Sequence, residues 1–409
     1  MAAFSRAAQL ERLLGLIERL TARGTKASSA YTKWRLAIFL TGLICTVALY
    51  KTEWYRTGNS ALGGFVALFA LIASYHSRLE QRIHRLRLWH ALKSVHLARI
   101  RLDWPAVPLP PGTRPESHAY ANDLDLVGPR SLLHLIDTTV SDHGRDRLIS
   151  WLLTQPPSDA HWKARRRLVQ ELTPRSLFRD HLVLASRLTG EQEINGRRLA
   201  AVLAHPVGFP RLSLILAVQG VLAASTMLLG LGALLNWLPG YWMFSFGTYA
   251  LIYFMTDQGE ELLEHAVGLH GEMERLGVVL SYLERRARSR RRSALAEACA
   301  PLLHDRRGPS ASVKRAASAL HGISVKAHPL IHLAVNALCP WDLWFTKRLR
   351  AVQTDIAQQL PVWLDRLAEV EAASALATFA FLHPTYVWPS QVPETAVRAV
   401  ALGHPLIPA

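Results

Sequence analysis

The feature that most constrains this chain is a run of 45 residues, from 212 to 256, that contains no Asp, Glu, Lys or Arg. At about 1.5 Å per helical residue, such a run could cross a hydrocarbon core of roughly 30 Å twice. Pro239 and Gly240 interrupt it, and these residue types end helices. The run predicts a transmembrane hairpin at residues 206–256. The alternative, a buried hairpin in a large soluble core, is disfavoured because soluble domains rarely carry so long a run without charge.

A second pair of uncharged segments, residues 36–50 and 57–77, lies nearer the N-terminus. Trp34 and Tyr50 border the first of them, and aromatic residues are typical of membrane interfaces. These segments predict another hairpin at residues 34–77, which gives four spans in total. None of the four contains Asp, Glu, Lys or Arg, and ion-coupled transporters generally need charged groups within the membrane. The hairpins are therefore interpreted as anchors.

Basic residues set the expected orientation. Residues 1–35 and 78–103 carry seven Lys or Arg each, whereas the 51–59 loop has two and the 236–240 loop has none. Because Lys and Arg concentrate on the cytoplasmic side, we expect a multi-pass protein of the cytoplasmic (inner) membrane with both termini in the cytoplasm. The whole chain has 47 Lys plus Arg against 31 Asp plus Glu, a net charge of +16 that suits anionic lipid or nucleic acid as partner.

The segments around the spans differ in character. Residues 1–33 place Leu10, Leu13, Leu14, Ile17 and Leu20 on one helical face, which predicts an amphipathic helix that lies on the membrane or packs on the protein. Residues 78–117 contain a basic helix and then a proline-rich linker. Cys45, Cys299 and Cys339 are too few and too scattered for a disulfide framework or a cysteine zinc site.

Three blocks of sequence follow one another in an order that a known family shares. The first contains Asp123-Leu-Asp-Leu126, then Ser131-Leu132, Thr138-Thr139 and Trp151-Leu-Leu153 before Pro156-Pro157, with short helices that Ser141 or Asp142 and Ser158 or Asp159 cap. The second is a long helix over residues 363–380, and the third is Leu402-Gly-His-Pro-Leu-Ile407. Together the blocks resemble the core of the MutS family of DNA mismatch-repair ATPases, in a membrane-bound branch.

The resemblance implies a domain order. Residues 118–205 would form the first part of a MutS-like core, residues 257–383 a part with long lever helices, and residues 384–409 the entry to an ATPase domain. It also implies DNA as a partner, a homodimer, and ATP with Mg²⁺ as cofactors of that domain. The phosphate-binding pattern Gly-x-x-x-x-Gly-Lys-Ser/Thr does not occur in the 409 residues, so we expect no cofactor in this chain and assign no catalytic residue.

Two stretches in the second half show heptad spacing. One is marked by Leu262, Ala266, Leu269, Met273, Leu276, Leu280 and Leu283, and the other by Ile356, Leu360, Trp363, Leu367, Val370, Ser374 and Ala377. Such spacing predicts two long helices, each packed along one seam, and most seams of this kind are simply core. His328 and His332 are four residues apart but lack a third ligand, so no metal site is assigned.

The first of these helices ends in six arginines: Arg285, Arg286, Arg288, Arg290, Arg291 and Arg292. A basic run is most often a solvated helix end, but it is also the pattern that contacts nucleic-acid phosphates without reading sequence. We name these six residues the arginine cluster and take them as the candidate phosphate contacts. No aromatic residue interleaves them, so base stacking is not indicated.

The sequence thus predicts an all-α protein: two transmembrane hairpins and a MutS-core-like cytoplasmic helical domain with lever helices. Its expected function is a membrane-anchored, DNA-structure-binding or regulatory half without its own ATPase, with hydrolysis lost or supplied by a separate ATPase chain. Two alternatives stay open. The protein could be a membrane scaffold that binds another protein and no DNA, or a truncated fragment of a DNA-dependent ATPase.

Overall fold

The computed structural model describes most of the chain as α-helix. The described residues are 2–52, 54–111, 118, 120–121, 123–154, 158–190, 192–204, 211–255, 260–289, 292–303, 308–323, 329–390 and 398–407. No strand occurs among them, and their one isolated bridge joins Ser141 to Ile194. The all-α prediction is confirmed. The chain divides into two compact units, Met1–Leu135 with Phe379–Ala409, and Ile136–Thr378.

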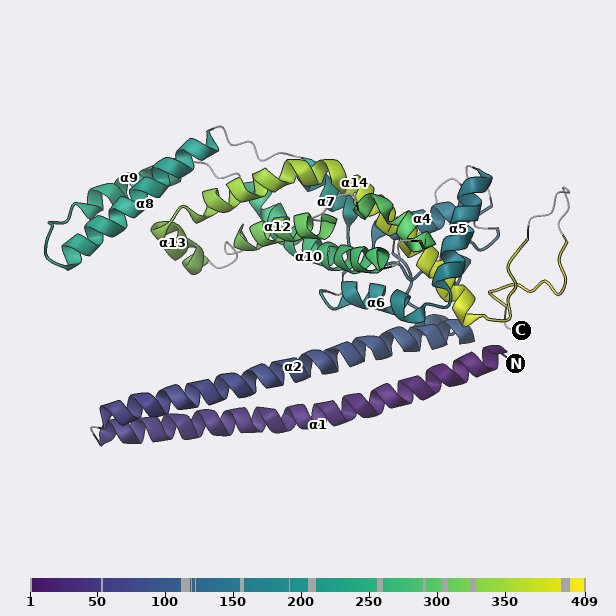
Figure 1. Cartoon of the computed structure of the whole chain (residues 1–409), viewed down its shortest axis with the longest axis horizontal. Helices are drawn as coiled ribbons and strands as arrows, with labels where there is room; N and C mark the ends of the chain where they lie inside the picture. The colour runs from purple at the N-terminus through teal and green to yellow at the C-terminus, as the bar shows by residue number, and fades with distance from the viewer. Residues whose placement is uncertain are drawn as a thin grey trace. The chain divides into compact units, whose positions relative to one another are not determined.

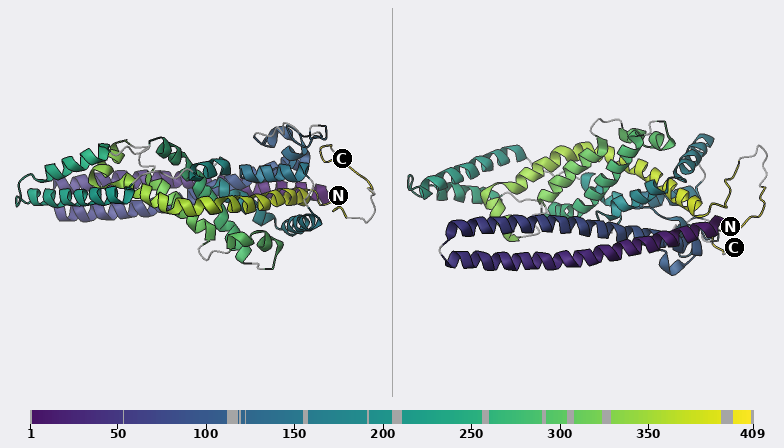
Figure 2. Two further views of the ribbon diagram at one scale, coloured as in Figure 1. Left: turned by 90° about the horizontal axis from the view of Figure 1, so that it is seen from above. Right: turned by 60° about the horizontal axis from the view of Figure 1, so that its bottom comes forward.

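The first unit contains a long antiparallel pair, α1 (Ala2–Lys51) and α2 (Tyr55–Arg101), which run side by side in Figures 1 and 2. The amphipathic segment and the first apolar segment are thus one continuous helix, and the second apolar segment continues into the basic helix. Of the predicted apolar face, Leu10, Leu14 and Ile17 are buried and pack against protein, whereas Leu20 is 42% exposed. Short η1 (Trp104–Ala106) and α3 (Leu132–Ile136) follow.

The half of the α1–α2 pair that adjoins the connection between the two helices exposes apolar side chains. Ile44 and Leu71 are each 67% exposed, and other large apolar residues around them are exposed as well. Both helices are long and apolar enough to cross a membrane, as is α8 (Leu212–Leu234) in the second unit. Side chains that would be costly in water are suited to lipid, which explains why this pair has so little core of its own.

The fourth expected span differs from the prediction. Its helix, α9 (Trp242–Met255), has 14 residues and is shorter than a span, because about 20 helical residues are needed to cross roughly 30 Å. Among the described residues, three helices therefore qualify, not four. α9 nevertheless packs on α8 as a hairpin (Figure 1), and the hydroxyl groups of Ser225 and Ser245 lie 2.7 Å apart across it. Asn236, in the turn, adopts a left-handed backbone with φ of 56°.

The rest of the second unit is a helical core. Its helices are α4 (Asp142–Leu153), α5 (Asp159–Leu172), α6 (Ser176–Arg187), α7 (Gly196–Ala204), α10 (Glu260–Arg288), α11 (Ala294–Ala298), η2 (Ala300–Leu303), α12 (Gly308–Ile323), α13 (Pro329–Leu338) and α14 (Trp341–Leu382). α14 carries Pro361 in its interior, where the missing N–H removes a helical hydrogen bond, and it curves along its length in Figure 1.

Both heptad seams lie in this core, so their interpretation as core is confirmed. Leu269, Met273, Leu276, Leu280 and Leu283 of α10 are all at most 2% exposed. The seven seam positions of α14, from Ile356 to Ala377, are also buried. The side chains of Leu262 and Ala266 lie outside the described residues. Of the capping alternatives, the hydroxyl groups of Ser141 and Ser158 accept from Gly144 N and His161 N and cap α4 and α5.

Candidate functional site

The arginine cluster sits at the C-terminal end of α10. Arg285, Arg286 and Arg288 occupy its last turn, and Arg292 follows before α11. Cationic side chains stabilise this end of a helix because its last carbonyl groups carry partial negative charge. Arg290 and Arg291 lie outside the described residues. The structure thus places four of the six predicted phosphate contacts within a short stretch of surface.

These four arginine side chains are exposed. Within the described part of the chain, none of them forms an ion pair with a carboxylate. Arg285 donates to Ser281 O at 3.1 Å, a bond within its own helix. Arg286 lies over the Tyr282 ring, 5.4 Å from its centre. The end of α10 therefore presents guanidinium groups that pair with no carboxylate of the described residues.

Tyr282 supports this surface from below and does not contribute a stacking face. Its ring is 8% exposed and stacks on Phe178 of α6 with 5.5 Å between centres. Its hydroxyl group donates to Phe178 O at 3.1 Å. Burial raises the pKa of Tyr282, and the charge of Arg286 opposes that rise. The prediction that bases do not stack here stays a prediction, and the burial of this one neighbouring aromatic ring agrees with it.

A buried carboxylate fixes the position of the cluster relative to α12. Glu284, next to Arg285 in sequence, accepts from Ser310 N at 2.7 Å and from the Ser310 hydroxyl group at 2.9 Å. Gly308, two residues before Ser310, has a φ of +71°, and a Cβ added to it would lie 2.6 Å from a carboxylate oxygen of Glu284. Only glycine meets both requirements without strain. The cluster therefore stands on a helix end that is tied to a neighbouring helix.

A second polar site joins the start of α4 to α14 and was not predicted from the sequence. Glu371 of α14 is 2% exposed. One of its oxygens, Oε2, accepts from Val140 N and Ser141 N at 3.2 Å each, and from the Ser141 hydroxyl group at 2.9 Å. Gly144 packs so closely that an added Cβ would overlap this oxygen and lie 2.8 Å from the carboxyl carbon.

Burial raises the pKa of Glu371 to about 8, although the bonds from Ser141 and Val140 oppose the rise. Its other oxygen, Oε1, has no hydrogen-bond partner among the described residues. At neutral pH the carboxyl group of Glu371 is thus mainly protonated and uncharged. Its oxygen Oε2 accepts hydrogen bonds from the two residues that precede α4. The sequence held one signal: Glu371 has no basic residue three or four positions away on its helix, so no local ion pair could account for it.

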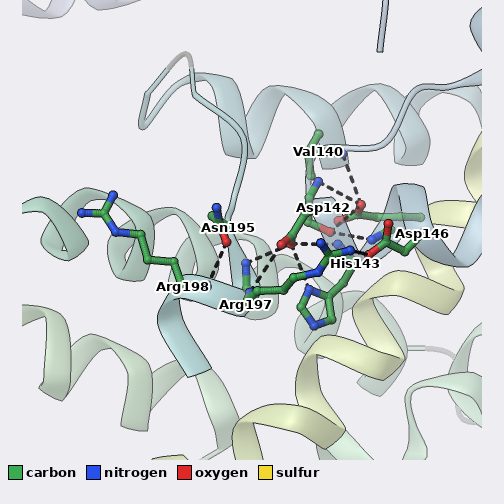
Figure 3. Close-up of polar contacts among 11 residues, drawn as sticks. Val140, Asp142, His143, Asp146, Asn195, Arg197 and Arg198 are labelled. Atoms are coloured by element: carbon green, nitrogen blue, oxygen red, sulfur yellow. Dashed lines mark hydrogen bonds and ion pairs between the residues drawn. The ribbon is translucent and has the colours of Figure 1, made fainter. Parts of the chain in front are cut away.

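Asp142, the next residue after Ser141, has a lowered pKa, in contrast to the raised pKa of Glu371 (Figure 3). It accepts from Gly196 N at 2.9 Å and from His143 N at 2.8 Å, and its Oδ1 lies 2.9 Å from His143 Nδ1. Burial by itself would raise the pKa of Asp142, but these contacts lower it to about 2. The carboxylate links the start of α4 to the start of α7.

The structure describes only one member of the remaining candidate, the histidine pair. His332 Nε2 contacts Asp342 Oδ2 at 2.7 Å, and His328 lies outside the described residues. Across the part of the chain that the structure describes, no three metal-ligating side chains come together.

Comparison with known proteins adds no relative: no protein-family model, no curated protein and no solved structure matches this chain.

Proposed function

We propose that this chain is a membrane-anchored helical protein whose arginine cluster binds the phosphates of duplex DNA. It would be the DNA-structure-binding or regulatory half of a MutS-like system, with hydrolysis lost or supplied by a separate ATPase chain. The observation that carries the DNA contact is the group of exposed arginines at the end of α10, which have no carboxylate partner among the described residues. Guanidinium groups bind phosphate through paired hydrogen bonds. The relation to MutS rests on the sequence resemblance alone.

The anchoring part of the proposal uses α1, α2 and α8 as spans and α9 as the arm that returns the chain. The contact between α8 and α9 supports a hairpin in which both ends lie on one side. With the basic flanks inside, both termini lie in the cytoplasm at the inner membrane. Reporter fusions after residues 56 and 238 should then be external, and fusions after 110 and 409 internal. A fusion after 409 that reports from outside would show that α9 does not return the chain.

Salt-dependent DNA binding tests the arginine cluster. We expect the detergent-solubilised chain to bind duplex DNA with little sequence preference and with affinity that falls steeply as salt rises. Each phosphate contact removed flattens the log–log salt slope by roughly one unit. The double variant Arg285→Ala, Arg288→Ala should therefore lose about two units of slope. Arg286 is left in place because it also covers Tyr282.

A charge-matched control separates a local contact from a change in net charge. Lys347 and Arg348 are exposed near the start of α14, where Trp341 Nε1 donates to Gly322 O at the C-terminal end of α12. The arginine cluster lies at the other end of α12, beside Gly308. Lys347→Ala with Arg348→Ala removes the same charge and should leave the slope nearly unchanged. Equal slopes for the wild type and the cluster variant would refute the DNA contact.

A scaffold that binds another protein is the second candidate, and a different surface favours it. Val387, Val400 and Leu402, in the C-terminal segment of the first unit, are 90%, 95% and 86% exposed. Apolar side chains that remain this exposed are typical of surfaces that a partner covers. A chain that is integrated in the membrane but binds no duplex DNA at any salt concentration would favour the scaffold.

A further inference from the structure

The outward face of α1 changes its chemistry along its length. Positions on this face recur at steps of three, four or seven residues. They carry Arg19, Arg23, Lys26 and Lys33 in the first part and Leu40, Ile44 and Val47 in the second, and all seven side chains are exposed. A face that passes from basic to apolar within one continuous helix is typical of a helix that leaves water and enters lipid.

The outward face of α2 shows the same change in reverse. Leu68, Leu71 and Tyr75 are followed on this face by Arg78, Arg82 and Arg85, at alternating steps of three and four. All six side chains are exposed. We call the seven exposed cations of the two faces, Arg19, Arg23, Lys26, Lys33, Arg78, Arg82 and Arg85, the basic collar.

Contacts between the two helices put both changes at one level. The rings of Tyr31 and Tyr75 lie 5.2 Å apart between centres, just where each face turns from apolar to basic. Farther toward the basic end, His90 Nε2 lies 3.0 Å from Glu18 Oε1. Six members of the collar therefore lie on the side of the Tyr31–Tyr75 contact that is away from the apolar half, and Lys33 lies two residues beyond Tyr31 toward that half.

The acidic groups of this region are already engaged with the hairpin itself. Glu80 is the one carboxylate within residues 19–35 and 76–89, and it accepts from the Ser28 hydroxyl group of the other helix. The Ser28 oxygen also lies 2.9 Å from His76 Nε2, and both residues are buried. Among the described residues, no member of the collar forms an ion pair with a carboxylate. The outward charge of the collar is consequently available to an external anion.

We infer that the basic collar binds the head-group phosphates of anionic phospholipids in the leaflet that borders it. The inference rests on the membrane anchoring proposed above. By helical rise, Arg78 lies about 4.5 Å and Arg85 about 15 Å beyond Tyr75. The head-group layer is roughly 5–8 Å thick on each side, and surface charge acts over about a further 8–10 Å. By these distances, the collar extends from the head-group layer into the adjoining water within reach of its surface charge, on the same faces that present apolar side chains to the acyl chains.

Lipid retention tests this inference. The full chain is reconstituted into phosphatidylcholine vesicles that hold a minority of phosphatidylglycerol, extracted in mild detergent, purified, and analysed for the two lipids. We expect phosphatidylglycerol to be enriched over the input ratio. One basic side chain near an anionic surface contributes about 1 kcal/mol, or about fivefold in binding. The variant Arg78→Gln, Arg82→Gln, Arg85→Gln should therefore lower the enrichment by at least about fivefold. High salt during extraction should weaken it as well.

The control variant Lys314→Gln, Arg315→Gln, Lys347→Gln removes the same charge from exposed positions of α12 and α14 and should keep the enrichment. No enrichment in the wild type, or equal enrichment in the wild type and the collar variant, would overturn the inference. A collar variant that loses DNA binding while it keeps its phosphatidylglycerol would overturn it too and assign the collar to nucleic acid. Resistance to carbonate extraction reports membrane integration separately, so a failure of anchoring is distinguishable from a failure of lipid selection.

Discussion

Glu371→Gln should change how the stability of the helical core depends on pH. The carboxyl group is fully enclosed, and burial raises its pKa to about 8 from an ordinary value of 4.5. Between these two values the folded state binds a proton that the unfolded state has released, so stability falls as pH rises. Gln keeps the shape and an accepting oxygen for Val140 N and Ser141 N, and it carries no charge at any pH. The variant should lack this part of the pH dependence.

The size of the effect follows from the two pKa values. As the pH rises from 5.5 to 8.5, the titration of Glu371 should lower the free energy of unfolding of the wild type by on the order of 3 kcal/mol. The Gln variant should not lose this stability. About 1 kcal/mol moves the unfolding midpoint by about 2–4 °C for a body of 150–250 residues. The midpoint of the variant minus that of the wild type should therefore rise by about 6–12 °C over this range.

Thermal unfolding of the two full-length proteins in one detergent, at several pH values, measures this difference. Taking the difference removes the titration of the histidines, which both proteins share. At pH 5.5 the variant should be slightly the less stable, by about 1 kcal/mol, because its amide N–H₂ takes the place of Oε1, which has no partner among the described residues. A difference that stays constant from pH 5.5 to 8.5 would refute the assignment of a buried, proton-binding Glu371.

Three further predictions concern the same core and the missing phosphate loop. Gly144→Ala should destabilise the protein by more than about 2 kcal/mol through overlap with Glu371, whereas Gly220→Ala in α8, where a Cβ meets nothing within 4 Å, should be neutral or better; equal midpoints for the two would contradict the packing. Asp142→Asn should destabilise above pH 4 and lose its effect as pH falls toward 2, since the pKa of Asp142 is about 2 and only the ionised group has the full stabilising contacts; a pH-independent difference in unfolding midpoints would contradict this. The purified chain should show no Mg²⁺-dependent ATP turnover in a phosphate-release assay, and turnover that persists through further purification would require a nucleotide site of another kind.

Periodicity made the helices and seams of the core predictable. The spacing of Leu269, Met273, Leu276 and Leu280 specifies one helical face, and burial of that face needs no further information. The sequence narrowed the caps of α4 and α5 to two neighbouring residues each, because capping depends on residues within one turn, and the structure selects Ser141 and Ser158. The sequence also indicated an apolar helix at residues 241–254, one residue from the observed bounds of α9 at each end, but the prediction that this helix spans the membrane was wrong because 14 residues are too few.

The polar junction around Glu371 depends on contacts that sequence order hides. Glu371 meets Val140 and Ser141, which lie about 230 positions earlier in the chain. The sequence shows that Glu371 has no basic residue three or four positions away, but it does not show the partners of this carboxylate. For the arginine cluster, the sequence indicated the charge, and only the structure shows that Glu284, the nearest acid on the helix, is directed to Ser310. A local signal thus located the arginine cluster but not the Glu371 site, and long-range packing determined the partners of both.

Co-flotation of labelled duplex DNA with vesicles tests the central claim, a DNA-binding surface held at a membrane. The full chain is reconstituted into phosphatidylcholine vesicles, which carry no net charge of their own, and floated through a density gradient with the DNA at low salt. The account predicts that DNA rises with the protein-bearing vesicles, that Arg285→Ala with Arg288→Ala reduces this DNA strongly, and that Lys347→Ala with Arg348→Ala does not. DNA that stays at the bottom with all three proteins, or that floats equally with all three, would contradict it.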